Sequence, residues 1–330
     1  MKKFLIIAIL ISMVLIVGGC FAKPQEKSSA PQTKAEYTAK VATLRGPSAV
    51  SIIPMIDAKT SLSEKVKAEY QLYNSPDILA PDLIKGQVDA ALLPPNLAAK
   101  LYNKGADYQL VGVTCWGVMY LASNNPELTS IKQLKGQQLF ITDKGATPDL
   151  VLKYLLAKNN MSANDVKLDY SLGQTELAQN MAAGRVNAGL LVEPWLTVVT
   201  SGNPKVNTII DIQKEWQAAT DNQPLPQTCL VVKKSLIAEH PEVVASLVKE
   251  INQAIEWVNA HPQEAGALVE RNNIGMKAAV IAKAIPRLNL RFENAAASRP
   301  AIQSFFKIIN QADPTSTGGR LPDDGFYYQK

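Results

Sequence analysis

GQVDAALLPPNL (residues 86–97) recurs, slightly changed, as GRVNAGLLVEPW (184–195). A glycine, a valine, an alanine and two leucines occupy matching positions in the two segments. A glycine directly before an apolar run suits the left-handed residue that ends many helices. Each segment is therefore predicted to end a helix and begin a short buried strand, so one structural unit is expected twice.

The repeat continues upstream of both segments. A strand-like stretch at 37–45 leads into GPSA at 46–49, and another at 136–142 leads into GATP at 145–148. Each copy then alternates helices and strands, a pattern that indicates a parallel sheet with helices on both faces. We therefore predict an α/β fold of two lobes, each a mainly parallel sheet flanked by helices, with a cleft between them. Chance similarity between two βαβ units is the alternative.

The predicted cleft lies beyond the carboxyl ends of the strands, where open α/β sheets bind ligands. Helix N-termini there offer unpaired amides and a partial positive charge, which attract anions and carbonyls. Helix capping by Ser48 and Thr147, and core packing of Trp116, are the alternatives. The residues expected to contact a ligand are Gly46, Pro47, Ser48, Asn96, Trp116, Ala146, Thr147, Glu193 and Trp195.

The triplet Glu193-Pro194-Trp195 stands out in the second copy. A carboxylate beside an indole suits a ligand with a cation or a donor on an apolar body. Glu193 should disfavour a small anion unless Arg45 or Lys144 compensates its charge. Alternatively, Glu193 accepts hydrogen bonds from backbone amides and Trp195 packs in the core.

The N-terminus has the pattern of a secreted lipoprotein. Two lysines precede an apolar run at 4–17, which is short for a membrane span and suits a signal peptide. The run ends in Val-Gly-Gly-Cys, which resembles the lipobox of bacterial lipoproteins and implies a lipid on Cys20. We expect a signal peptide over 1–19 and a lipidated flexible tether over 20–37. An uncleaved anchor helix is the alternative.

The remaining chain is predicted to divide into a discontinuous lobe 1 (38–125 and 223–330) and an inserted lobe 2 (126–222), with a hinge near 118–128 and 222–230. Besides Cys20, the chain has Cys115 and Cys229, both in strand-like contexts. A disulfide is possible outside the cytoplasm. Two buried free thiols are the other possibility.

Composition argues against several classes of function. The net charge is only +5 over 330 residues, and no stretch concentrates lysine and arginine as a nucleic-acid-binding surface would. The two histidines, His240 and His261, each precede a proline that would open a helix. Because no nucleophile, metal or phosphate-loop motif occurs, we expect neither an enzyme nor a metal or cofactor site.

The order of these features resembles that of the solute-binding proteins of ABC importers, in particular the nitrate/sulfonate/taurine-like (SsuA/THI5-like) family, which includes binders of thiamine-precursor pyrimidines. The segments that carry the resemblance are the lipobox at Cys20, the two repeats, LTSIKQLKGQQLFIT at 128–142, EPW at 193–195 and SLIAEHPEVV at 235–244.

The resemblance implies a type II periplasmic-binding-protein fold in a monomer, outside the cytoplasm and anchored to the membrane by lipid on Cys20. It implies capture of a small organic or oxyanion-bearing solute, of sulfonate, nitrate, taurine or pyrimidine type, and delivery to a permease and its ATPase. It does not specify the solute. The alternatives are a sensor lipoprotein that signals to a membrane partner and an enzyme similar to thiamine-pyrimidine synthases.

Overall fold

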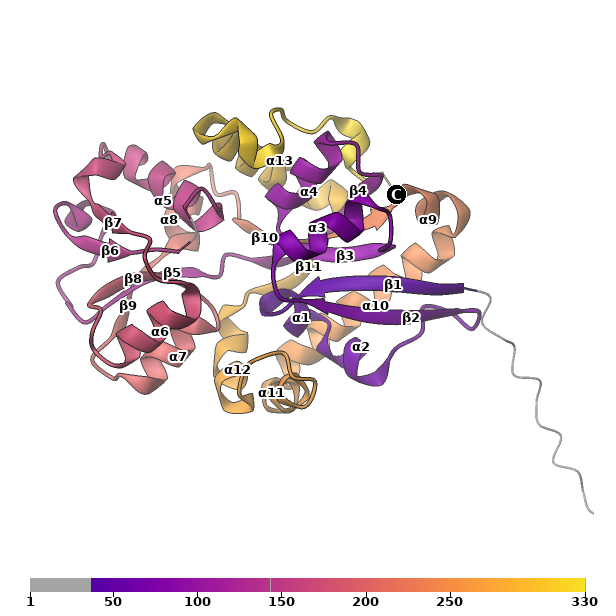
Figure 1. Cartoon of the computed structure of the whole chain (residues 1–330), viewed down its shortest axis with the longest axis horizontal. Helices are drawn as coiled ribbons and strands as arrows, with labels where there is room; N and C mark the ends of the chain where they lie inside the picture. The colour runs from indigo at the N-terminus through magenta and orange to yellow at the C-terminus, as the bar shows by residue number, and fades with distance from the viewer. Residues whose placement is uncertain (1–36, 143, 330) are drawn as a thin grey trace, which may run out of the picture. The chain divides into compact units, whose positions relative to one another are not determined.

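A computed structural model describes residues 37–142 and 144–329 (Figure 1). The predicted signal peptide, Cys20 and nearly all of the tether lie outside these ranges. The strands are β1 (Tyr37–Leu44), β2 (Val66–Tyr73), β3 (Ala90–Leu93), β4 (Tyr108–Trp116), β5 (Met119–Ser123), β6 (Gln138–Phe140), β7 (Lys167–Asp169), β8 (Ala188–Val192), β9 (Asn207–Asp211), β10 (Pro226–Lys233) and β11 (Leu290–Asn294).

Helices connect most of these strands. The α-helices are α1 (Pro47–Ser51), α2 (Ile53–Ala58), α3 (Pro76–Ile84), α4 (Pro95–Asn103), α5 (Thr147–Lys158), α6 (Gln174–Ala182), α7 (Trp195–Gly202), α8 (Ile212–Ala219), α9 (Lys234–Glu239), α10 (Pro241–Ala260), α11 (Pro262–Arg271), α12 (Ala278–Ala284) and α13 (Ala295–Ala312). The 3-10 turns are η1 (Ile131–Leu134), η2 (Ala163–Asp165), η3 (Ile285–Arg287), η4 (Pro314–Thr317) and η5 (Asp324–Phe326).

The strands form two sheets, and we call each sheet with its flanking helices a lobe. Lobe 1 has six strands in the order β11-β4-β10-β3-β1-β2, and lobe 2 has five in the order β7-β6-β8-β5-β9. Apart from β11, the two orders match strand for strand, with β10 and β5 in equivalent positions. The two-lobed α/β prediction is confirmed at the level of the sheets.

Both sheets are mixed, rather than mainly parallel as expected. In lobe 1, β1 runs parallel to β2 and β3, but β10 runs antiparallel to β3 and β4. In lobe 2, β6 runs parallel to β7 and β8, but β5 runs antiparallel to β8 and β9. The physical reason is connectivity, because β5 and β10 arrive from the opposite sheet and enter between strands of the local βαβ units.

The repeated segments occupy equivalent positions. Gly86 follows α3 with φ 65°, and Gly184 follows α6 with φ 72°, so both lie in the left-handed region that glycine favours. The apolar residues that follow form β3 and β8. The prediction of a helix end and a buried strand in each copy is confirmed.

The apolar core is continuous between the lobes. One cluster of buried side chains includes Leu93 in β3, Leu139 in β6, Trp216 in α8 and Phe305 in α13. The rings of Trp216 and Phe305 lie 6.0 Å apart, edge to face. Helix α13 therefore belongs by sequence to the C-terminal part of lobe 1 but packs against lobe 2.

The chain first crosses between the sheets at Gly117 and Val118, because β4 pairs in lobe 1 and β5 already pairs in lobe 2. This crossing precedes the domain boundary placed at 125/126. The return crossing lies between α8 and β10, around 220–225. The division into domains beyond these strand pairings stays a prediction.

Cys115 and Cys229 are free thiols. They lie on adjacent antiparallel strands, where Cys115 pairs with Thr228 and Cys229 with Val113. Cys115 packs into the apolar cluster under α10, whereas Cys229 packs into the cluster that includes α13. The two side chains therefore point to opposite faces of the sheet, and this geometry excludes a disulfide between them.

Candidate ligand-binding site

A cavity of about 690 Å³ is lined by residues of both lobes. Lobe 1 contributes the turns before α3 and α4, the start of β10 and the turn η4, and lobe 2 contributes the turn before α5. The lining residues are Asn74, Ser75, Pro76, Asp77, Pro94, Asn96, Leu97, Lys100, Lys144, Gly145, Ala146, Thr147, Pro148, Gln227, Asp313, Thr315 and Ser316. This volume suits a small organic molecule.

Three helix N-termini meet at this cavity. Helices α3, α4 and α5 begin at Pro76, Pro95 and Thr147, and in none of the three does the preceding residue cap the helix with a side-chain hydrogen bond. The first amides of a helix have no partner within the helix, and its dipole places partial positive charge there. The cavity therefore favours an anionic or carbonyl group on its ligand.

Two buried polar atoms in the cavity wall lack a hydrogen-bond partner among the described residues. They are Oδ1 of Asn96 in α4 and Oγ of Ser316 in η4. Ser316 is only 8% exposed. Since buried polar atoms are nearly always paired in folded proteins, these two atoms point to a polar ligand as the missing partner.

The cavity wall carries charges of both signs. Lys100 and Lys144 are exposed cations, and Asp77 is an exposed anion. Asp313 is occupied locally, because its Oδ1 accepts from the backbone amide (2.9 Å) and the hydroxyl (2.7 Å) of Thr315. The two lysines and the two aspartates balance in formal charge, so the positive character of the cavity comes from the helix N-termini.

A buried carboxylate shapes the turn before α5. Asp149 accepts from the Gly145 amide (2.7 Å), from Lys153 (2.8 Å) and from the Tyr170 hydroxyl (2.7 Å). Gly145 has φ 83°, which the turn requires of a glycine. Burial and the bond to Asp149 raise the pKa of Tyr170, so the phenol stays a neutral donor. These contacts fix the turn that leads into α5.

Asn96, Ala146 and Thr147 are the expected ligand residues that line this cavity. Gly46 and Pro47 are half-buried outside its lining. Ser48 is buried, and its Oγ lies 3.1 Å from Oγ1 of Thr228. Sequence reasoning thus missed the lining residues Lys100, Gln227 and Ser316. No local signal marks Ser316, because it reaches the cavity from the far end of the chain.

The expected aromatic contacts lie elsewhere. Trp116 is fully buried, its Nε1 donates to the Arg291 carbonyl (3.2 Å), and the Arg291 guanidinium lies 4.5 Å from the ring centroid. Trp195 is half-buried and packs against a lobe 2 cluster that includes Leu196 and Val199. Trp116 is enclosed within the fold and Trp195 packs partly against lobe 2, so both positions correspond to the packing alternative.

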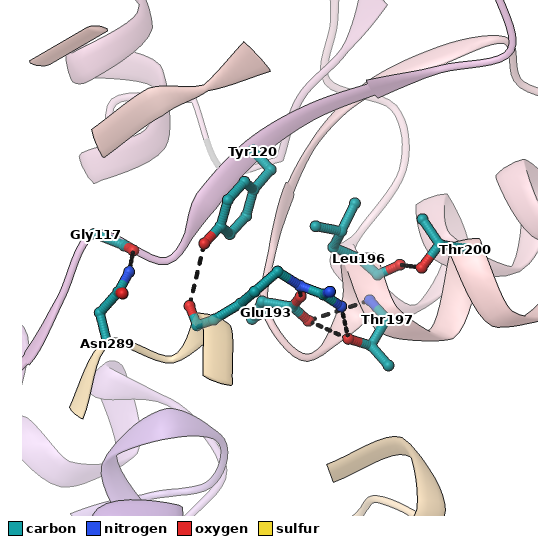
Figure 2. Close-up of polar contacts among 8 residues, drawn as sticks. Gly117, Tyr120, Glu193, Leu196, Thr197, Thr200 and Asn289 are labelled. Carbon is teal, nitrogen blue, oxygen red and sulfur yellow. Dashed lines mark hydrogen bonds and ion pairs between the residues drawn. The ribbon is translucent and has the colours of Figure 1, made fainter. Parts of the chain in front are cut away.

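Glu193 is fully buried and already engaged (Figure 2). Its Oε2 accepts from the Thr197 amide (3.1 Å) and hydroxyl (2.8 Å), and its Oε1 accepts from Nε of Arg287. Arg287 also donates to the Thr197 hydroxyl at 2.6 Å. We expected Glu193 to face a ligand cation, but the cation it faces belongs to the protein. Arg45 and Lys144, the compensating residues considered above, take no part in this network.

The described residues contain neither a metal-binding cluster nor a membrane-spanning helix. Within residues 37–142 and 144–329, no three His, Cys, Asp or Glu side chains come close enough together to hold a metal ion. None of the helices in these ranges has the length and apolar character needed to cross a membrane.

Residues 107–265 match the family model described as NMT1/THI5 like. No curated protein matches the chain significantly. Among solved structures, an ABC transporter protein from Parabacteroides distasonis is 28% identical, with a TM-score of 0.78 over 89% of this chain and 99% of that chain.

Two further solved structures share the fold. The periplasmic aliphatic sulphonate binding protein SsuA from Escherichia coli is 15% identical (TM-score 0.69, covering 91% of this chain and 93% of that chain). The periplasmic nitrate-binding protein NrtA from Synechocystis PCC 6803 is 13% identical (TM-score 0.54, 74% and 69%). The resemblance stated from the sequence is confirmed by the family model over residues 107–265 and by the fold, and the Escherichia coli and Synechocystis neighbours are binding proteins.

Proposed function

We propose that this chain is the solute-binding component of an ABC uptake system. The observation that carries the proposal is the cavity between the lobes. Three helix N-termini without side-chain caps line it, together with two buried polar atoms that have no hydrogen-bond partner among the described residues. The similarity to the Parabacteroides protein and to the sulphonate- and nitrate-binding proteins supports the same role. In this role the lobes enclose a solute and present it to a permease, whose transport cycle an ATPase drives.

The proposed solute is a small molecule that bears an oxyanion or carbonyl group, in the range of sulfonates, nitrate, taurine and pyrimidine derivatives. The amides at the N-termini of α4 and α5 would bind its electronegative group. Asn96, Thr147 and Ser316 would hydrogen-bond its polar substituents, and Lys100 and Lys144 would attract it by charge.

The proposed location of the protein rests on the signal peptide and lipobox expected from the sequence. We propose that Cys20 carries the lipid and holds a monomeric binding protein on the outer face of a bacterial membrane. The proposed tether at 20–37 would be flexible by its composition and would let the lobes move between solution and permease. Signalling to a membrane sensor is the second candidate, because it uses the same ligand-binding step.

Thermal unfolding with sulfonates, nitrate, aminopyrimidines and aromatic acids tests the binding step. A true ligand at 100 times its Kd stabilises the protein by about 2.7 kcal/mol, and the effect grows with concentration. Asn96→Ala should weaken binding about tenfold, since one hydrogen bond is worth about 1.4 kcal/mol here. Asn252→Ala, at a hydrogen bond within α10, is the matched control and should leave affinity unchanged.

If none of these compounds stabilises the protein, and denaturation of the purified protein releases no bound compound, the binding role is contradicted. Transport and sensing are then separated with the loaded protein and the permease complex in liposomes. Transport requires that the loaded protein raise the ATPase rate above that with the empty protein.

A further inference from the structure

The ion pair between Glu193 and Arg287 joins segments of different lobes. Glu193 directly follows β8 of lobe 2, whereas Arg287 ends η3, which leads into β11 of lobe 1. Helix α12, just before η3, also packs against α7 of lobe 2. A C-terminal segment of lobe 1 is therefore bound, by charge and by packing, to the turn that carries Glu193.

The same segment is bound to the first crossing between the sheets (Figure 2). The Tyr120 hydroxyl donates to the Arg287 carbonyl at 3.2 Å, and Nδ2 of Asn289 donates to the Gly117 carbonyl at 2.5 Å. On the other side of the crossing, the Glu193 amide donates to the Val118 carbonyl at 2.9 Å. The crossing strand is thus held between residues 287–289 of lobe 1 and Glu193 of lobe 2.

Because Glu193 is buried, its carboxylate depends on the positive charge of Arg287. Glu193 has no solvent exposure, and the Arg287 side chain is 40% exposed. Within the described residues, Arg287 is the one cation paired with the Glu193 carboxylate. A buried carboxylate without a cation is strongly unfavourable, because the protein interior solvates charge poorly. Rotation of the lobes that moved Arg287 away would leave Glu193 uncompensated.

We propose that Arg287 is a positioning residue that sets the angle between the lobes through its ion pair with Glu193. The proposal rests on the proposed function, since that angle determines how the two walls of the solute cavity meet. Arg287 acts through the crossing at 117–120 and not by contact with the solute, because it does not line the cavity. It also keeps the Glu193 carboxylate from acting as a ligand group.

Hydrogen–deuterium exchange of the full chain tests the proposal without any ligand. Arg287→Gln should raise exchange about tenfold in peptides covering 117–120 and 193–197, with little change in β1 and β2. Arg271→Gln removes an ion pair of the same chemistry within lobe 1, between α11 and Asp57. This control should leave exchange at 117–120 and 193–197 at the wild-type level.

The double variant Glu193→Gln/Arg287→Gln separates positioning from stability. It removes both charges, so the melting temperature should recover towards the wild type, while exchange at the crossing stays raised. Recovery of both properties would show that the pair acts only on stability and would overturn the proposal. Unchanged exchange in Arg287→Gln, or an equal rise across both sheets, would overturn it as well.

A second measurement tests whether the ion pair between Arg287 and Glu193 affects ligand binding. For any compound that stabilises the wild type, Arg287→Gln should raise the Kd by about tenfold, and Arg271→Gln should not. If no compound binds, the proposed function fails, yet the exchange measurements still decide whether Arg287 positions the lobes. The two failures are therefore distinguishable.

Discussion

Gly117 is the residue at which local geometry most constrains the fold. It lies at the first crossing with φ 39°, and a Cβ at this position would meet the Gln213 side chain, including its Cβ at 2.6 Å. Oε1 of Gln213 accepts from the Leu225 amide at 3.0 Å, and the Gly117 amide donates to the Leu225 carbonyl at 2.8 Å. One glycine therefore allows both crossings to lie in contact.

Gly117→Ala should lower the free energy of unfolding by about 2–4 kcal/mol, because left-handed strain and overpacking add. Gly136→Ala is the control, since Gly136 also has a positive φ (75°) but open space where an added Cβ would lie. It should cost only about 1 kcal/mol. Urea unfolding measures both, and equal losses would show that contact with Gln213 is unimportant.

The two buried thiols allow a second prediction at this scale. Burial raises the pKa of Cys115 to about 12 and raises the pKa of Cys229 as well. At pH 8 both groups are protonated and therefore poor nucleophiles. A thiol reagent should label neither in the folded protein, and both at once in urea without reductant. Failure to label both in urea would indicate a disulfide or another modification.

At the scale of elements, α13 decides how the C-terminal part of the chain joins the two lobes. Asn294 caps the helix, with its Oδ1 accepting from the Ala297 amide at 2.9 Å. Phe305 is fully buried and contacts both Trp216 of lobe 2 and Phe306 of its own helix. The helix therefore bridges the two lobes through its aromatic face.

Phe305→Ala should lower the free energy of unfolding by about 3–5 kcal/mol, because it leaves a cavity where both lobes pack. Ile78→Ala is the control, since Ile78 on α3 is 55% exposed. It should change stability by no more than about 0.5 kcal/mol. Chemical denaturation measures both, and a loss below about 1 kcal/mol for Phe305→Ala would contradict the bridging role.

For the folded body as a whole, the shared apolar cluster links the stability of the two lobes. Its members come from β3 and α4 of lobe 1, from β6 and α5 of lobe 2, and from α13. Neither lobe can unfold without exposing the apolar face that it shares with the other. The two lobes thus form one cooperative unit, although each has its own sheet.

Calorimetry should accordingly show a single unfolding transition for the two lobes, with a calorimetric enthalpy close to the van't Hoff enthalpy. A ligand should move this one transition to higher temperature without splitting it. Two separate transitions, one of them unaffected by a ligand, would contradict the continuous core.

Much of the architecture could be predicted because the signals for it come from residues that are close together in the sequence. Gly86 and Gly184 mark positions where the backbone needs a positive φ. The apolar runs after them mark strands that must be buried. His240 and His261 are expected to precede helices on the same local grounds, and α10 and α11 begin directly after them. Asn96, Ala146 and Thr147 line the cavity between the lobes, and their positions at helix starts after strands are local signals too; their contact with a ligand stays a prediction.

The sequence by itself determined the two-lobed α/β plan, because periodicity and turn chemistry depend on neighbours in the chain. Only the tertiary structure decided that Arg287 neutralises Glu193, that Cys115 and Cys229 face apart, and that Ser316 reaches the cavity. These outcomes depend on which distant segments meet. A charged side chain such as Glu193 can act on a ligand only if no other residue of the protein already neutralises it.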